Sequence, residues 1–215
     1  MVVSIIVVLV ALLLPAVRMV REAALGASCG SQARQLCAAI LQYAQDADGI
    51  LLPPAVPYPN TIYPSATFRT WADLLVDTDE GLGALLDCPA HQKAVRWSYA
   101  NAWNHSYLFN NQYWNVPSQD IALAPLGRIF GGTVLFADGG AWYKFVAVAN
   151  PAVDLGEGSK RCVSGWPGWP GELVARHGRK LNAACADGHV EALDLVELSA
   201  TNAGGAYPLL TRSKD

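Results

Sequence analysis

The feature that most constrains this chain is its first apolar run, VVSIIVVLVALLLPAV, over residues 2–17. The run carries no charge, one hydroxyl at Ser4 and one proline at Pro15, and the basic residues Arg18 and Arg21 follow it. Burying apolar surface gains about 25 cal/mol per Å², so a soluble protein cannot easily expose such a segment. The run must enter a bilayer, be removed by processing, or pack against copies of itself. Each outcome points to the cell envelope.

The apolar run continues into one long helix, hydrophobic at first and then amphipathic. Beyond the basic pair, apolar residues recur at intervals of three and four. They are Val20, Ala23, Ala24, Ala27, Ala33, Leu36, Cys37, Ile40 and Ala44. The helix is expected to end near Asp48, because Gly49 suits a left-handed position and Pro53-Pro54 cannot continue a helix. We therefore expect one helix of about 45 residues within 1–48, about 65–70 Å long, with residues 1–17 in a membrane or filament core.

A cleaved signal peptide is the main alternative for this segment. It would need a basic region before the apolar core and a small-residue cleavage site after it. Neither flank has that pattern, and the helical spacing runs straight through Arg18, Arg21 and Glu22. A spanning helix wants about 20 apolar residues, slightly more than this run offers. We favour a retained helix over a signal peptide.

Residues 49–215 are expected to form a globular, β-rich head with loop-rich insertions. Asp138-Gly139-Gly140 and Asp187-Gly188 each separate two short apolar runs. Asp-Gly in that position favours a two-residue hairpin, because both central residues accept a positive φ. In the second hairpin Cys185 would face Val190, and Ala186 would face His189. The predicted fold class is α+β, with the long helix packed on a small antiparallel sheet.

Composition excludes several classes of function. The net charge is −3 with 15% charged residues and no Lys/Arg stripe, so nucleic-acid binding is not expected. No cysteine forms a C-x-x-C pair or lies at zinc spacing from a histidine, so no metal site is predicted. Cys88 is a candidate for a disulfide, and its partner is left open. The cysteines are Cys29, Cys37, Cys88, Cys162 and Cys185.

Two N-terminal segments and one C-terminal segment resemble a known family. They are ALLLPAVRMVREAA (11–24), CGSQARQLCAAILQYAQDADGILLPP (29–54) and RHGRKLNAACADGHVEAL (176–193). The first two resemble the helix of bacterial prepilin-like proteins, which include type IV pilins and type II secretion pseudopilins. The third contains His177, nine residues and then Asp187-Gly188, which is similar to the H-x9-DG signature found near the end of many such proteins. The signature region is taken as residues 177–188.

The resemblance implies a pilin-like or pseudopilin-like structural subunit, or an accessory of a filament or secretion system. It implies an anchor in the inner membrane, a head outside the cytoplasm, and assembly with copies of itself or with other pilin-like subunits. The chain departs from the family because it lacks the basic leader and the Phe-Thr-Leu-Ile-Glu start. Aligned on Pro15, it begins about seven residues inside the expected mature helix. We expect either an upstream start or a copy that is not processed.

His177, Asp187 and His189 could also form a catalytic or metal cluster. A general base needs a partner and a pocket, and a metal needs convergent ligands, neither of which the sequence supplies. We favour an Asp187-Gly188 turn, with His177 bonding the turn's backbone from a neighbouring strand. Similarly, Asp46 and Asp48 are better explained by a helix end than by calcium binding, because further oxygen ligands are missing.

The tryptophan-rich segments suggest a second class of function. Segments 97–114 and 166–169 could stack on sugars, which would make the chain an exported surface-binding module for a glycan or protein. Such aromatics more often fill gaps between a sheet and its loops. No nucleophile elbow, phosphate-binding loop or paired-carboxylate motif is visible. We expect neither enzymatic activity nor a cofactor.

Overall fold

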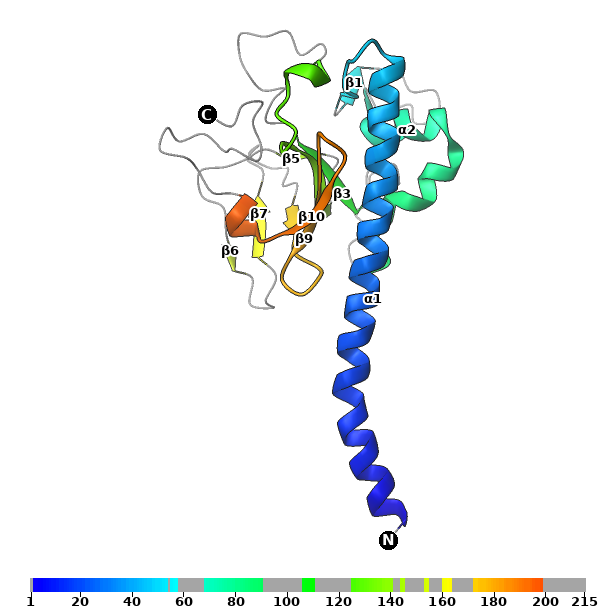
Figure 1. The fold of residues 1–215 in the computed structure, drawn as a ribbon, viewed down its shortest axis with the longest axis vertical. Helices are drawn as coiled ribbons and strands as arrows, with labels where there is room; N and C mark the ends of the chain where they lie inside the picture. Colours follow the sequence, from blue (N-terminus) through cyan, green and yellow to red (C-terminus); the bar gives the residue numbers. More distant parts are fainter. Residues whose placement is uncertain are drawn as a thin grey trace.

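The computed structural model describes residues 2–53, 55–57, 68–90, 106–110, 125–140, 144–145, 153–154, 160–163 and 172–198. Its first element is helix α1, Val2–Asp46, which corresponds at 1.5 Å per residue to about 68 Å. The C-terminal half of α1 runs beside the sheet, whereas the N-terminal half projects away from the rest of the molecule (Figure 1). The predicted long helix is confirmed.

One face of the C-terminal half of α1 is buried in the head. Six residues on this face have no exposed surface: Cys29, Ala33, Leu36, Cys37, Ile40 and Ala44. Their spacing of three and four residues places them on one stripe, as predicted. The helix ends where Asp48 and Gly49 adopt positive φ angles of 53° and 80°, and the Gly49 amide donates to the carbonyl of Ala44. Gly49 thus has the predicted left-handed conformation.

The described part of the head contains ten short strands. They are β1 (Ala55–Pro57), β2 (Phe68–Thr70), β3 (Tyr107–Asn110), β4 (Val134–Gly140), β5 (Lys144–Phe145), β6 (Val153–Asp154), β7 (Lys160–Val163), β8 (Glu172–Val174), β9 (Leu181–Cys185) and β10 (Val190–Leu193). The main sheet has the order β10-β9-β4-β8-β7-β6, with β3 also paired to β4. These pairings are antiparallel, and β1 and β2 form a separate antiparallel ribbon. The fold is therefore α+β.

The first predicted hairpin is wrong. Asp138 and Gly139 lie inside β4, where Asp138 is opposite Tyr107 of β3 and Gly139 is opposite Leu173 of β8. No turn is needed there, because the backbone stays paired on the sheet. The segment after β4 also differs from the prediction, since β5 pairs in parallel with β3 instead of returning along β4.

The second hairpin is confirmed, but with a different register. Val190 is opposite Ala184 instead of Cys185, and the Cys185 amide donates to the carbonyl of His189. The loop therefore holds three residues, 186–188, and its last residue, Gly188, has φ +93°. A three-residue loop that ends in the left-handed region is a common alternative to the two-residue turn.

Helix α2 (Trp71–Thr78) and the 3₁₀ helix η1 (Glu80–Leu86) complete the core. Thr70 and Asp73 form a reciprocal capping box that fixes the start of α2. The buried ring of Trp71 lies 5.6 Å from that of Phe109 and 5.7 Å from that of Phe136. Two shorter helices, η3 (Leu126–Arg128) and α3 (Leu195–Leu198), are also present. Trp71 thus anchors α2 to strands β3 and β4.

Candidate functional site

The N-terminal half of α1 presents a continuous apolar surface. Its large hydrophobic side chains between Val3 and Val20 are 47–73% exposed. The described residues include one helix long and apolar enough to cross a membrane, and its most apolar 18-residue window has no buried residue. Eighteen helical residues span about 27 Å, close to the thickness of a bilayer's hydrocarbon core. By length and composition, this segment can serve as a membrane anchor or a signal sequence.

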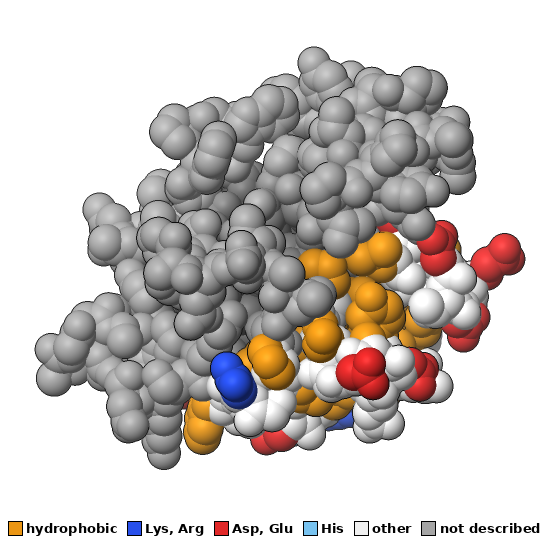
Figure 2. Space-filling model, turned by 90° about the horizontal axis from the view of Figure 1, so that it is seen from above, with side chains coloured by type: hydrophobic (Ala, Val, Ile, Leu, Met, Phe, Trp, Pro, Cys, Tyr) orange, Lys and Arg blue, Asp and Glu red, His pale blue; other side chains and the backbone are white. Residues whose placement is uncertain are grey.

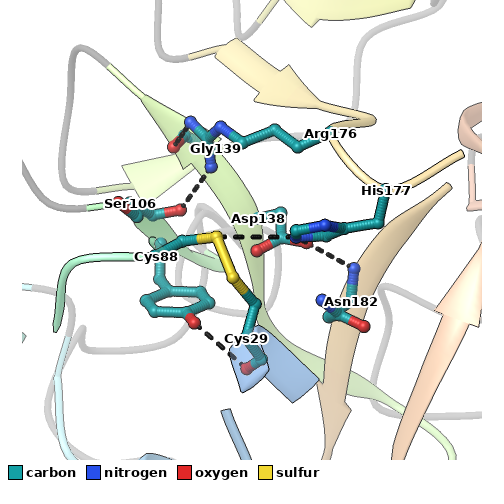
Figure 3. The surroundings of a disulfide bond; sticks show 9 residues. Cys29, Cys88, Ser106, Asp138, Gly139, Arg176, His177 and Asn182 are labelled. Atoms are coloured by element: carbon teal, nitrogen blue, oxygen red, sulfur yellow. Dashed lines mark hydrogen bonds and ion pairs between the residues drawn. A yellow bond between two sulfur atoms is a disulfide. The ribbon is translucent and has the colours of Figure 1, made fainter. Parts of the chain in front are cut away.

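A second candidate site surrounds the disulfide between Cys29 of α1 and Cys88 (Figure 3). The bond answers the question that the sequence left open, because Cys29 is the partner of Cys88. It joins α1 to the segment that follows η1, across 59 residues of chain. Closing a loop of that length stabilises the fold by about 4 kcal/mol in the chain-entropy model. The phenol of Tyr107 donates to the carbonyl of Cys29 at 3.2 Å.

Residues 175–180 leave the sheet between β8 and β9 and bring two side chains to this disulfide. The backbones of His177 and Lys180 bond each other at 3.1 Å in both directions, around a turn in which Gly178 and Arg179 have positive φ angles. The guanidinium of Arg176 donates to the carbonyl oxygens of Ser106 and Gly139. These bonds hold the excursion against β3 and β4.

Asp138 lies on β4 between Gly139, which pairs with β8, and Ala137, which pairs with β9, so it is next to the segment 175–180. Its side chain is fully buried, and its Oδ2 accepts a hydrogen bond of 2.6 Å from the backbone amide of Asn182. Its Oδ1 has no hydrogen-bond partner among the described residues. Burial raises the pKa of Asp138 to about 6, against the opposing effects of the Asn182 hydrogen bond and the Arg176 charge. Asp138 is therefore a functional candidate that sequence reasoning treated only as a turn residue.

The imidazole of His177 lies between Asp138 and the disulfide. Its Nε2 atom is 3.5 Å from Asp138 Oδ2 and 3.5 Å from Cys88 Sγ, and its side chain is 9% exposed. Burial and the nearby charge of Arg176 lower the pKa of His177. The ring packs over Gly26 of α1, where a Cβ atom would be 3.5 Å from the imidazole. The expected bond between His177 and the Asp187-Gly188 turn is thus replaced by contacts with Asp138 and Cys88.

The Asp187-Gly188 end of the signature lies at the opposite end of β9 from His177. The amide of Asp187 donates to the carbonyl of Gly131, and its carboxylate accepts from the amide of His189. Burial alone would raise the pKa of Asp187, but the contacts with His189 outweigh it and lower this pKa. A Cβ atom on Gly188 would be 3.2 Å from Cδ1 of Leu41. The turn therefore packs directly on α1.

The described residues bring His177, Asp187 and His189 to two places instead of one. His177 reaches the disulfide, whereas Asp187 and His189 contact each other on an exposed hairpin. Between them, the thiol of Cys37 donates to the carbonyl of Cys185 at 3.4 Å. Segment 177–188 is therefore a strap along α1, fixed at its start by His177 and at its end by Gly188. Burial raises the pKa of Cys185 to about 12, which disfavours the thiolate form of this side chain.

A cleft of about 790 Å³ lies between α1, α2 and η1, away from this cluster. The end of the head seen in Figure 2 carries apolar side chains flanked by Asp and Glu. The cleft is lined mostly by Gln35, Ala38, Ala39, Gln42, Tyr43, Asp46, Ala47, Thr78, Asp79 and Leu82. The residues that line this cleft do not include Cys29, Cys88, Asp138 or His177. The tryptophans at positions 97, 103, 114, 166 and 169 lie outside the described residues.

Comparisons with protein-family models, with curated proteins and with solved structures find no match to this chain.

Proposed function

We propose that this chain is a pilin-like protein of the cell envelope, acting as a structural subunit or accessory of a filament or secretion system. The N-terminal half of α1 anchors the chain in the inner membrane or packs with other pilin-like subunits in a filament core. The head lies outside the cytoplasm. The observation that carries this proposal is the division of α1, whose second half is buried in the head while its first half is apolar and uncovered.

The Cys29–Cys88 disulfide supports placing the head outside the cytoplasm. Stable structural disulfides persist mainly in oxidising compartments such as the periplasm and the cell surface. Cys29 and Cys88 are 0% and 3% exposed, which is typical of a structural bond. The disulfide and the apolar helix independently favour an envelope protein.

The described part of the head favours a structural role over catalysis. His177 and Asp138 are close enough for acid–base chemistry, but their side chains are 9% and 0% exposed and do not line the cleft. A general base must reach a substrate proton. The H-x9-DG signature instead makes backbone and packing contacts with α1 and the segment before β4. We infer that the signature fixes the head on its helix.

Cell fractionation of the full chain tests the anchor. The full chain should sediment with membranes and need detergent for extraction, because residues 3–20 expose their apolar side chains. The double variant Leu9→Lys/Leu13→Lys should shift to the soluble fraction, because each lysine near the bilayer centre costs about 2.5–3.5 kcal/mol. Leu9→Met/Leu13→Met is the matched control and should stay with the membranes. A wild-type chain that is soluble and monomeric would refute the proposal.

A further inference from the structure

Three side chains able to bind a metal converge beside α1, although they are far apart in the sequence. The Sγ atoms of Cys29 and Cys88 and a ring nitrogen of His177 all lie within 4.8 Å of one another. Cys88 is 59 residues from Cys29 and 89 residues from His177, so no short sequence motif indicates this group. In the structure the two sulfurs are bonded to each other and the imidazole lies against one of them (Figure 3).

The position of His177 fits a tetrahedral metal site. Zinc binds thiolate at about 2.3 Å and imidazole at about 2.0–2.1 Å, so neighbouring sulfur and nitrogen ligands are about 3.6 Å apart. The distance between Cys88 Sγ and His177 Nε2 is 3.5 Å. The imidazole therefore needs little movement. The change required is that the disulfide opens and its sulfurs separate to about 3.8 Å, the spacing of two thiolates on one zinc ion.

Asp138 places a carboxylate against the imidazole of this group. Its Oδ2 is 3.5 Å from His177 Nε2 and also accepts the amide of Asn182 at 2.6 Å. The carboxyl group is fully buried, and its Oδ1 has no hydrogen-bond partner among the described residues. Carboxylates that contact a metal-bound histidine orient the ring, so Asp138 is suited to position His177.

The charges also balance. With the disulfide closed, ionised Asp138 faces the cation of Arg176, and the sum is zero. With the disulfide open, two thiolates add two negative charges, which one divalent metal ion cancels. Buried charges are tolerated when they are paired or coordinate a metal. Both states of the site are therefore electrically neutral.

We propose that the reduced form of this chain binds one thiophilic divalent metal ion, such as Zn²⁺, through Cys29, Cys88 and His177, with the Asp138 carboxylate beside the imidazole. A dithiol reductant supplies two electrons and two protons, which convert the disulfide to two thiols, and the reductant itself becomes a disulfide. The metal then displaces both thiol protons. The disulfide and the metal are alternative links between α1 and the segment after η1.

The test uses the full chain in detergent micelles, with the other three cysteines (Cys37, Cys162 and Cys185) replaced by alanine. A water-soluble phosphine reduces the disulfide and is itself oxidised to the phosphine oxide, with the oxygen supplied by water. Co²⁺ is then titrated anaerobically as the probe. We expect one equivalent to produce thiolate-to-cobalt charge-transfer bands and the visible bands of tetrahedral Co²⁺, both absent before reduction. Zn²⁺ should displace the Co²⁺ and abolish the bands.

Variants assign the ligands. Cys88→Ser should abolish the charge-transfer bands, and His177→Ala and Asp138→Asn should each weaken Co²⁺ binding at least about tenfold. His189→Ala is the matched control, because His189 lies beside Cys185 and Glu191 in the other cysteine–histidine group of the described chain. The affinity of the His189→Ala variant for Co²⁺ should equal that of the parent protein. The proposal is overturned if reduced protein shows no thiolate bands, or if His177→Ala binds as tightly as the parent.

Near-ultraviolet circular dichroism addresses the fold of the reduced chain. If reduction alone loosens the head, adding Zn²⁺ should restore the spectrum of the oxidised protein, because the metal then links Cys29 to Cys88. If reduction leaves the head folded, the spectrum should stay the same while Co²⁺ still binds. A reduced chain that remains unfolded with saturating Zn²⁺ would contradict the proposal.

Discussion

Gly188 is required for two separate physical reasons. Its φ of +93° is a conformation that side chains with a Cβ atom rarely adopt. A Cβ atom at this position would also approach Leu41 Cδ1 to 3.2 Å, which is tighter than ordinary van der Waals contact. The glycine of the H-x9-DG signature thus both closes the hairpin and allows the hairpin to lie against α1.

Three glycine-to-alanine variants separate these two reasons. Gly49 has φ +80° and open space around it, whereas Gly127 has open space and no positive φ. We expect Gly127→Ala to change the free energy of unfolding little, and Gly49→Ala to lower it by about 1–2 kcal/mol. Gly188→Ala should lower it by about 2–3 kcal/mol, because Leu41 must also move. Urea unfolding of the full chain in micelles measures all three, and equal effects of Gly188→Ala and Gly127→Ala would contradict the account.

The same tripeptide, Ala-Asp-Gly, has different structures at 137–139 and at 186–188. At the second site Asp187 and Gly188 form the predicted turn. At the first site the carboxylate of Asp138 accepts the amide of Asn182, a residue 44 positions away, and the backbone remains in β4. Local turn propensity is equal at both sites, so the long-range hydrogen bond decides. The sequence pattern could not reveal it, and Asp138 was missed for that reason.

At the scale of elements, β9 and the loops at its two ends follow α1 closely. Possible Cβ atoms on Gly26 and Gly30 of α1 would lie 3.5 Å from His177 and Asn182 respectively. The small residues of the helix therefore face the strap where it crosses. Glycines in a helix interior lower its stability, but these two let the strap approach the helix. Helical spacing predicted the buried face of α1 correctly from Ala33 to Ala44, whereas Val20, Ala23, Ala24 and Ala27 share the spacing but are exposed.

Substitutions at Gly26 test this contact. Gly26→Ala places its Cβ at an ordinary contact distance from His177 and removes a helix-interior glycine, so it should stabilise the fold by roughly 0.5–1 kcal/mol. Gly26→Leu should destabilise it by about 1–3 kcal/mol, because the larger side chain must displace the imidazole. Ala27→Leu, at an exposed position on the same helix, is the control and should be nearly neutral. Thermal unfolding of the full chain ranks the stabilities of the three variants. If Gly26→Leu were as stable as the wild type, close packing of His177 on Gly26 would be disproved.

At the scale of the whole molecule, α1 passes from uncovered to covered along its length. The large hydrophobic side chains up to Val20 are exposed, and the buried face begins at Cys29. Arg18 lies near the end of the apolar region, Arg21 and Glu22 follow it, and all three are exposed. Charged side chains at the end of an apolar segment favour the membrane–water interface. The apolar run, its charged border and the buried stripe were all readable from the sequence; the disulfide partner and the strap were not, because they join distant segments.

This layout predicts how deeply each part of α1 lies in a bilayer. Leu9 and Glu22 are 13 residues apart, or about 20 Å along the helix. Spin labels on Leu9→Cys and Glu22→Cys, with Cys37, Cys162 and Cys185 replaced by alanine, report this depth in lipid vesicles. The label at position 9 should collide readily with oxygen and poorly with a polar nickel complex, and the label at position 22 should show the reverse. Exclusion of both reagents at position 9 would indicate that α1 packs against other copies, which is the filament form of the same proposal. Strong collisions with the nickel complex at both positions would place the apolar half of α1 in water, and the envelope function would fail with it.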